Sequence, residues 1–260
     1  MIYHRIITAC IVSLLVACQA SPLGRQQLRL LPEDQVAQMG AAAYQQIKQK
    51  TPPINDPRAI NYVNCVADAI TRQVSQGRWE VNVFEGKTAN AFALPGGKIG
   101  VNTAMLNLVQ NQDQLATVIG HEVAHVAAGH ANERLSASYA TQSGLELIRV
   151  LSGGGQGSQA LVGLLGAGAQ LGILLPYGRA QESEADLLGL DLMARAGFDP
   201  RASIPLWQNM AQAGGGRPPE FLSTHPSGST RSADLNARIP QALQLYEQAR
   251  AGGARPNCDR

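Results

Sequence analysis

Charged and aromatic side chains are scarce in this sequence. Of its 260 residues, 15% are charged and 5% are aromatic, whereas 45% are hydrophobic. Because a chain stays disordered only when its hydrophobicity is low and its charge is high, the composition excludes a disordered polymer and predicts a compact globular body. Lys and Arg total 21 against 19 for Asp and Glu, with no long basic run. This balance argues against nucleic acid as a partner.

The sequence also lacks an apolar run long enough to cross a bilayer, which takes about 20 residues. Residues 6–17 form a shorter run that follows Arg5 and ends in Leu-Val-Ala directly before Cys18. This arrangement predicts a lipoprotein signal peptide at 1–17, whose removal leaves Cys18 lipidated. An ordinary secretory signal with an incidental Cys18 is the alternative, and either would export the protein. Because Gln19 is not the Asp that retains many lipoproteins at the inner membrane, we expect a lipid anchor on the periplasmic side of the outer membrane.

Cysteine is rare as well, with four in the chain. Cys10 would leave with the signal peptide and Cys18 would be acylated. Cys65 and Cys258 would then be the thiols that meet an oxidising compartment. We expect a disulfide between them that ties the C-terminal tail to an early helix. Two unpaired thiols are the alternative.

Hydrophobic spacing predicts many helices and one small sheet, which is an α+β fold, and no internal repeat occurs. Residues 18–31 are expected to form a polar tether, 32–250 one domain and 251–260 a tail. Within the domain, 218–230 is expected to be a loop. The apolar stretch 160–175 is expected to be a buried core helix or, alternatively, a helix that touches lipid. Strands are expected at 79–84, 90–94 and 98–101, and helices at 32–50, 56 to about 70, 103–109, 113–129, 177–196, after 199 and, interrupted near Pro240, at 230–250.

The most specific feature is His-Glu-Val-Ala-His at 121–125, within the helix expected at 113–129. Residues four apart lie about 40° apart around a helix, so His121 and His125 can bind one Zn²⁺. Glu122 between them can contact a water at that ion. This is the pattern of a catalytic zinc site, and a plain helix with two solvated histidines is the alternative.

A catalytic zinc needs a third protein ligand, and one common source is excluded. The metzincin pattern continues with Gly and His at positions that Ala128 and Ala131 occupy here. His130 lies about 180° around the helix from His121 and cannot reach the same ion. We expect His130 to be a structural residue at the end of the helix.

The other source of a ligand is the stretch Arg-Ala-Gln-Glu-Ser-Glu-Ala-Asp at 179–186. Glu182 and Asp186 are four apart and share a helix face. Glu182 can therefore bind zinc while Asp186 accepts a hydrogen bond from a ligating imidazole. The small side chain of Ala185 would let the two helices approach. Glu184 points about 160° away from Glu182 and is expected on an acidic, solvated face.

These motifs resemble the gluzincin-type zinc metallopeptidases, which include the CAAX prenyl proteases, HtpX-like membrane proteases and periplasmic assembly-enhancing proteases. The sequence lacks the long apolar spans of the first group and the helical-repeat extension of the last, so it is most similar to the small lipoprotein members. The resemblance implies a mostly helical zincin-like (minigluzincin) domain whose small sheet has an edge strand bordering the active-site cleft. It rests on HEVAH at 121–125, RAQESEAD at 179–186, NAFALPGGKIGV at 90–101 and THP at 224–226 followed by Arg231.

The resemblance further implies an endopeptidase with one Zn²⁺ per chain, bound by His121, His125 and Glu182. Glu122 would act as general base and then as general acid, and Asp186 would orient a ligand histidine. An extended substrate would pair with the edge strand, which favours unfolded or misassembled polypeptides. The residues of that strand are Asn90, Ala91, Phe92 and Ala93.

Two more residues have roles that the resemblance leaves open. His225 is either a fourth zinc ligand that suppresses activity in a resting state or a loop residue that structures the cleft wall or contacts the substrate. Arg231 is a candidate for oxyanion support.

The leading interpretation is a zinc endopeptidase of the bacterial envelope that degrades misfolded or misassembled proteins. A zinc-containing chaperone or assembly factor for outer-membrane proteins, with little proteolysis, is the alternative. A structural lipoprotein with a vestigial site would bind no zinc, and the complete ligand set with an intact Glu122 argues against it.

Overall fold

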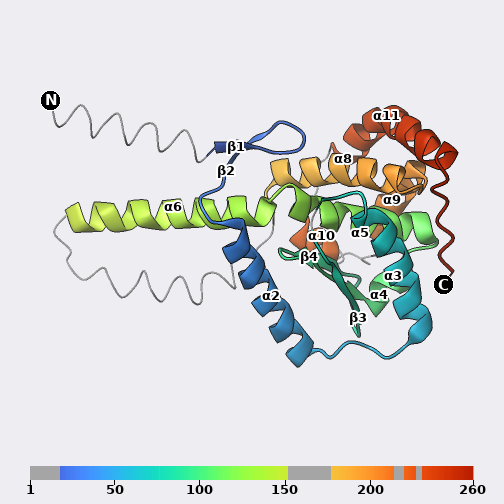
Figure 1. Cartoon of the computed structure of the whole chain (residues 1–260). Helices are drawn as coiled ribbons and strands as arrows, with labels where there is room; N and C mark the ends of the chain where they lie inside the picture. Colours follow the sequence, from blue (N-terminus) through green and yellow to red (C-terminus); the bar gives the residue numbers. More distant parts are fainter. Residues whose placement is uncertain (1–17, 76, 152–176, 214–219, 227–229, 260) are drawn as a thin grey trace.

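The computed structural model describes residues 18–75, 77–151, 177–213, 220–226 and 230–259. The expected signal peptide and the apolar stretch 160–175 lie outside the described residues. The described part consists mainly of helices packed around a small sheet (Figure 1). This confirms the expected α+β class. No helix in the described ranges has both the length and the apolarity needed to cross a membrane.

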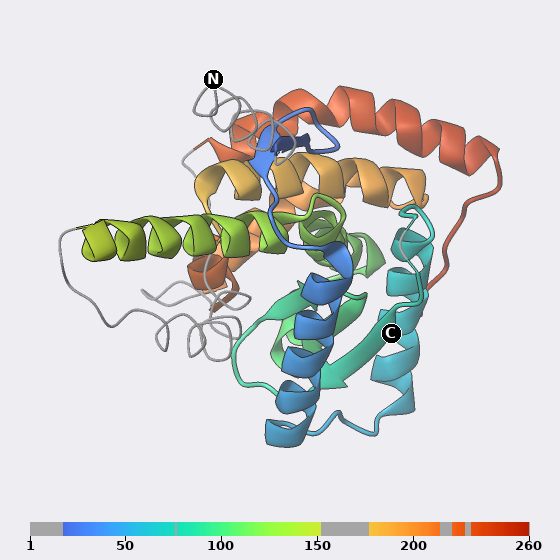
Figure 2. The ribbon, with the colours of Figure 1, turned by 60° about the vertical axis from the view of Figure 1, so that its left-hand side comes forward.

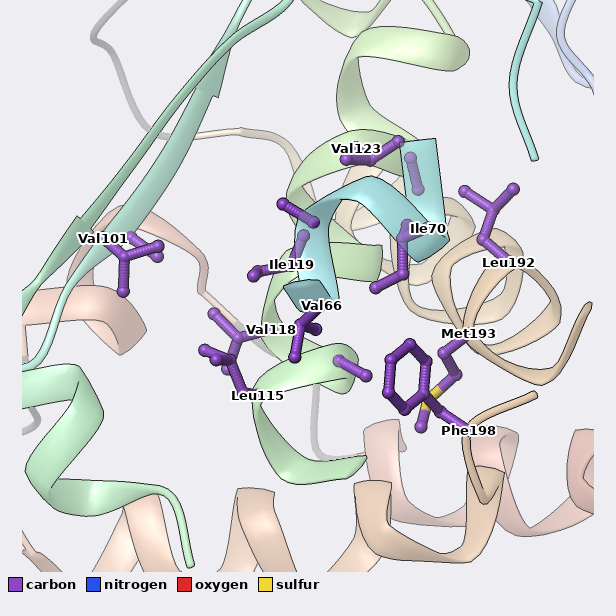
Figure 3. Packing of buried hydrophobic residues seen from close by; sticks show 14 of the residues in the cluster. Val66, Ile70, Val101, Leu115, Val118, Ile119, Val123, Leu192, Met193 and Phe198 are labelled. Carbon is purple, nitrogen blue, oxygen red and sulfur yellow. The ribbon is translucent and has the colours of Figure 1, made fainter. Parts of the chain in front are cut away.

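Helix α5 (Gln112–Ala127) lies at the centre of the domain. Its first turn is capped by Asn111, whose side chain accepts a hydrogen bond from the Gln114 backbone N–H at 3.0 Å. Every residue from 114 to 126 is buried, so the helix contacts protein on all sides. Its neighbours are α3 (Pro57–Thr71), α8 (Arg179–Arg195) and the sheet. Figure 3 shows Leu115, Val118 and Ile119 of α5 among side chains from these elements.

The sheet has three strands in the order β3-β5-β4, namely β3 (Glu80–Phe84), β5 (Lys98–Asn102) and β4 (Ala91–Leu94). β3 runs parallel to β5, and β4 runs antiparallel to it with Ala91 opposite Val101. Gly96 and Gly97 have φ of +80° and +71° and make the tight turn between β4 and β5. Within the described residues β4 is therefore an edge strand, and it packs against α5.

The remaining helices surround this centre. Helix α11 (Arg231–Ala251) lies along α8, and α6 (His130–Leu151) extends beyond the other helices in both ribbon views (Figures 1 and 2). From the end of α11 the chain returns to α3, where Cys258 forms a disulfide with Cys65 at a Cα–Cα distance of 5.6 Å. The other elements are α2 (Glu33–Lys50), α4 (Thr103–Leu108), η1 (Pro200–Ala202), α9 (Ser203–Ala213) and α10 (Glu220–Thr224).

Three expectations about local structure are wrong. The expected tether contains an antiparallel hairpin of β1 (Cys18–Ala20) and β2 (Gln26–Leu28), because its buried Ser21 and Gln27 pack on the domain. The expected loop at 218–230 contains α10. Helix α11 continues through Pro240 without interruption, since this proline lies on its exposed side.

Candidate active site

Helix α5 presents both histidines and the glutamate of the His-Glu-Val-Ala-His motif to one buried point. His121 and His125 are each 1% exposed and Glu122 is 2% exposed. The two Nε2 atoms of the histidines lie 3.1 Å apart. Solvated histidines, the alternative left by the sequence, are excluded by this burial.

Helix α8 adds the acidic residues from the opposite side. Oε2 of Glu182 lies 3.3 Å from Nε2 of His121, and its Oε1 lies 3.4 Å from Nε2 of His125. Asp186 faces the far side of His121, with Oδ1 2.9 Å from Nδ1. The structure thus gives these two carboxylates the shared face that their spacing predicts.

Two glycines bring α5 and α8 this close. A Cβ added to Gly120 would lie 2.8 Å from the carbonyl oxygen of Gly189, and a Cβ on Gly189 would lie 2.7 Å from the backbone nitrogen of His121. Ala185 is fully buried as well, but the closest approach of the helices is at these glycines. Because Gly189 lies one turn past Asp186, its lack of a side chain sets the distance between the two acidic residues and the histidines.

His225 enters the same site from the end of α10. Its backbone N–H donates to the Phe221 carbonyl at 2.8 Å, and its ring stacks on the Phe221 ring with centroids 4.5 Å apart. Nδ1 of His225 lies 3.2 Å from Nε2 of His121 and 3.1 Å from Oε1 of Glu182. Nε2 of His225 faces Glu122 at 3.2 Å.

The four potential ligand groups fit a tetrahedral metal ion. One ligand atom each from His121, His125, Glu182 and His225 lies within 4.8 Å of the other three. Ligands about 2.0–2.1 Å from a tetrahedral Zn²⁺ are about 3.3 Å apart, and the contacts given above span 3.1 to 3.4 Å. Nitrogen lone pairs that face one another at such distances need a cation or a proton between them. The donor set therefore fits a divalent metal.

Electrostatics support the same conclusion. Burial lowers the pKa of His125 well below its usual value and raises that of Glu122. Burial would also lower the pKa of His121, but hydrogen bonds to Asp186 and Glu182 outweigh it and raise this pKa to about 10. Burial would raise the pKa of Glu182, but three histidines hold it far below its ordinary value. The site thus holds the Glu182 carboxylate as an anion among three imidazoles, and a bound cation would balance its negative charge.

Comparison with known sequences now identifies the family. The model of peptidase family M48 matches residues 53–239, which include every residue of this cluster. The chain belongs to peptidase family M48. The family is one of metallopeptidases, and the buried cluster is able to hold a metal ion.

Named relatives of this M48 chain agree with that assignment. It is 39% identical over 181 residues to the mitochondrial metalloendopeptidase OMA1 of Saccharomyces cerevisiae, covering 66% of this chain and 50% of that protein. It is 32% identical over 257 residues to the mitochondrial metalloendopeptidase OMA1 of Homo sapiens, and this match covers 88% of this chain and 47% of the human protein. The beta-barrel assembly-enhancing protease of Escherichia coli K12 is 30% identical to this chain over 225 residues, and this match covers 83% of this chain and 46% of that protease. The chain spans about half the length of these relatives.

The edge strand of the M48 domain reaches the site. The backbone N–H of Ala93 donates to Oε2 of Glu122 at 3.0 Å. Ala91 and Ala93 are buried against the domain, and Phe92 on the other face of the strand is partly exposed. Asn90 directly precedes β4, and its carbonyl accepts a hydrogen bond from the Asn102 backbone N–H at 2.9 Å. The strand expected at 90–94 is therefore present as Ala91–Leu94 and contacts Glu122 beside the histidine cluster.

Arg231 lies behind the ligands and points toward the acidic residues. Its Nε donates to Oδ2 of Asp186 at 2.6 Å and its Nη2 to Oε2 of Glu182 at 3.2 Å. The guanidinium also lies over the Trp207 ring, 4.1 Å from the centroid. These contacts favour positioning of Glu182 and Asp186 over oxyanion support.

One prediction about α8 is wrong, and two neighbours of His125 were missed. Glu184 is 5% exposed and not solvated, because the β1–β2 hairpin covers it. His130, expected to be a structural residue at the helix end, is the first residue of α6, and its contact with His125 was not foreseen: its Nδ1 lies 2.8 Å from Nδ1 of His125. Tyr177 stacks on the His125 ring with centroids 3.8 Å apart. Helical spacing could not reveal these contacts, which join separate segments. The sequence around them, Gly-His-Ala-Asn-Glu-Arg at 129–134 and Tyr-Gly-Arg-Ala-Gln-Glu at 177–182, is polar and gives no signal for these contacts.

Proposed function

We propose that this chain is a zinc-dependent endopeptidase of the bacterial cell envelope. The observation that carries the proposal is the four-atom cluster of His121, His125, Glu182 and His225 with Glu122 beside it. Zn²⁺ is the ion whose ligand preferences, two or three imidazoles and a carboxylate in tetrahedral array, match this set. When bound, zinc lowers the pKa of a water to about 7 and polarises a peptide carbonyl.

The chain's own residues would carry the proton transfers and hold the site in place. Glu122, buried and next to the cluster, would accept the proton of the attacking water and deliver it to the leaving amine. Asp186 would hold the Nδ1 proton of His121, so that its Nε2 lone pair points at the metal. Arg231 would fix both acidic side chains of α8 through its two hydrogen bonds.

The substrate we propose is an extended segment of an unfolded or misassembled polypeptide. β4 is an edge strand in the described residues, and an added strand would place its peptide bonds next to Glu122. A folded domain cannot offer such a segment. Degradation of misassembled envelope proteins, which is protein quality control, is the function this substrate class supports, and similarity to the beta-barrel assembly-enhancing protease of Escherichia coli K12 supports it as well.

The proposed location rests on the amino-terminal sequence. A lipoprotein signal peptide at 1–17 and acylation of Cys18 would anchor the domain at the periplasmic side of the outer membrane. The bacterial relative supports an envelope location, whereas OMA1 is mitochondrial.

Metal analysis combined with digestion of an unfolded protein tests the proposed activity. The purified chain is expected to hold one Zn²⁺ and to cleave a permanently unfolded substrate such as reduced, alkylated casein, with loss of cleavage on chelation. Absence of zinc, or cleavage that chelation does not affect, would contradict the proposal.

A zinc-containing assembly factor with little proteolysis is the second candidate. The position of His225 favours it, because this side chain fills the coordination position that a catalytic zinc leaves open. Complementation with Glu122→Gln separates the two candidates. Unchanged cellular function in that variant would favour client binding over cleavage.

A further inference from the structure

A chain of polar contacts leads from His125 to the amino-terminal hairpin. Nδ1 of His125 lies 2.8 Å from Nδ1 of His130. Nε2 of His130 lies 3.1 Å from Oε2 of Glu184. Glu184 in turn accepts hydrogen bonds from the Ser21 hydroxyl and, at 2.8 Å, from Nε of Arg25. Three segments that are distant in the sequence, residues 21–25, residues 125–130 and Glu184, thus meet behind one proposed metal ligand.

The geometry fixes the position of every proton in this chain. His125 faces the metal cluster with Nε2, so as a ligand it carries its proton on Nδ1 and donates it to His130. Nδ1 of His130 must then be an unprotonated acceptor, which puts the His130 proton on Nε2. From there it is donated to Glu184. A carboxylate at the end of the chain therefore sets the tautomers of both imidazoles.

The hairpin holds this carboxylate rigidly. Arg25 donates from Nη1 and Nη2 to the two oxygens of Glu133 at 2.5 and 2.7 Å, while its Nε binds Glu184. The Arg25 backbone N–H donates to the Ser21 hydroxyl oxygen at 3.0 Å, and the Ser21 N–H donates to the Arg25 carbonyl at 2.8 Å. Gln181 donates to Glu133 at 2.6 Å and completes the network. His130 is 0% exposed, so water cannot replace its contacts with His125 and Glu184.

We propose that the β1–β2 hairpin is a structural part of the metal centre, and that Ser21 and Arg25 act through Glu184 and His130 to position the ligand His125. The inference rests on the proposed zinc site. Ser21 and Arg25 lie before the region matched by the family model, residues 53–239, whereas Glu184, His130 and His125 lie within it. Breaking the contact chain leaves all ligands present but lets the His125 ring reorient, which weakens metal binding.

Zinc affinity, measured by competition with a chromophoric chelator, tests the inference in three variants of the full domain. His130→Leu removes both hydrogen bonds of that imidazole and is expected to weaken zinc binding about 10- to 100-fold. His130→Gln restores an acceptor and a donor and should recover part of the loss. Arg25→Ala removes the hydrogen bond that the hairpin donates to Glu184 and leaves the core residues in place. It should weaken zinc binding about 10-fold, the lower end of that range.

Asp191→Asn is the matched control. Asp191 is a buried carboxylate on the same helix as Glu184, paired with Arg238 at 3.0 and 2.5 Å, and it contacts none of the metal cluster. We expect this variant to lose thermal stability but to keep the zinc affinity of the wild type. The d–d absorption spectrum of the Co²⁺-substituted protein should change in His130→Leu and Arg25→Ala and stay constant in Asp191→Asn.

Failure of this inference can be told apart from failure of the zinc site. If His121→Ala retains zinc, the ligand assignment itself is wrong. If His121→Ala loses zinc while both His130→Leu and Arg25→Ala keep the affinity and Co²⁺ spectrum of Asp191→Asn, the ligand assignment stands and the role of the hairpin is refuted. Should His130→Leu fail to fold, the Arg25→Ala result decides alone.

Discussion

The backbone N–H of Ala93 and Oε2 of Glu122 are joined by a 3.0 Å hydrogen bond between the edge strand and the metal-site helix. This bond puts the proposed general base in contact with the strand that would hold the substrate. A polypeptide added alongside β4 would therefore lie next to both Glu122 and the metal ligands, and a small shift in either element would separate them. The predictions below follow from this arrangement.

Substitution of any one of three ligands by Ala should remove zinc. His121, His125 and Glu182 are held by the closely packed helices α5 and α8, and after the loss of one of them the third ligand would have to be His225, which follows the five-residue helix α10 and is a weaker anchor. Metal analysis after dialysis should give about one Zn²⁺ for the wild type and close to none for each variant. Glu184→Ala should still bind one Zn²⁺ at saturating metal, because Glu184 contacts the ligands only through His130. If Glu182→Ala and Glu184→Ala lost the same amount of bound Zn²⁺ per chain, the ligand assignment would be refuted.

Glu122→Gln should bind zinc and fail to cleave. The amide oxygen of Gln can still accept the Ala93 hydrogen bond, so the site keeps its shape while the proton acceptor is lost. We expect the rate of casein digestion to fall at least about 10²-fold, with zinc content unchanged. Turnover close to that of the wild type would show that another group transfers the proton.

His225→Ala should raise peptidase activity. If His225 is a resting-state ligand, its removal opens the position that water and substrate need, while three ligands still hold zinc. The measurement is kcat/KM for a quenched fluorescent peptide, with the double variant that adds Glu122→Gln as the inactive control. A lower kcat/KM with intact zinc would instead assign His225 to the cleft wall or to substrate contact.

Reduction of the disulfide should destabilise the domain without releasing zinc. Cys65 and Cys258 are 193 residues apart in sequence, for which chain entropy gives about 5 kcal/mol at most. Removing a disulfide usually costs less unfolding free energy than this limit, so the melting temperature should fall by roughly 5–10 °C. Alkylation of unreduced protein followed by mass spectrometry checks the bond, and label on both cysteines would disprove it. Loss of zinc on reduction would contradict the expectation that the Cys65–Cys258 disulfide plays no part in the zinc site.

Acid should destabilise the protein partly through Glu80. Hydrogen bonds from Lys48 at 2.6 Å and the nearby Lys98 outweigh burial and lower the Glu80 pKa below its ordinary 4.5. A lowered carboxyl pKa stabilises the fold above the ordinary value, and this contribution is lost as the pH falls through the folded value. The melting temperatures of wild type and Glu80→Gln should therefore differ at pH 7 and converge as the pH falls below 4.5 and through the lowered pKa of Glu80 in the folded protein. A difference in melting temperature between the two proteins that stays the same at every pH would contradict the role assigned to Glu80.

Local interactions made much of this protein predictable from sequence. The four-residue spacings of His121 with His125 and of Glu182 with Asp186 fix which side chains share a helix face, because helix geometry depends on neighbours alone. The Pro-Gly-Gly turn fixes the β4–β5 hairpin for the same reason. Hydrophobic periodicity likewise placed α2, α3, α5, α8 and α11 within a few residues of their observed ends, but it did not predict α6.

Contacts between distant segments were decided only by the tertiary structure. Spacing shows that Glu184 points away from the zinc face, but not whether water or protein lies on that side. The β1–β2 hairpin lies there, and Arg25 reaches Glu184 across 159 residues of sequence. Similarly, the turn at Gly129, with φ of +68°, brings His130 back against His125. Helical periodicity gives directions around one axis, whereas the partner that a side chain meets depends on how separate elements pack, and this is set by the whole core together.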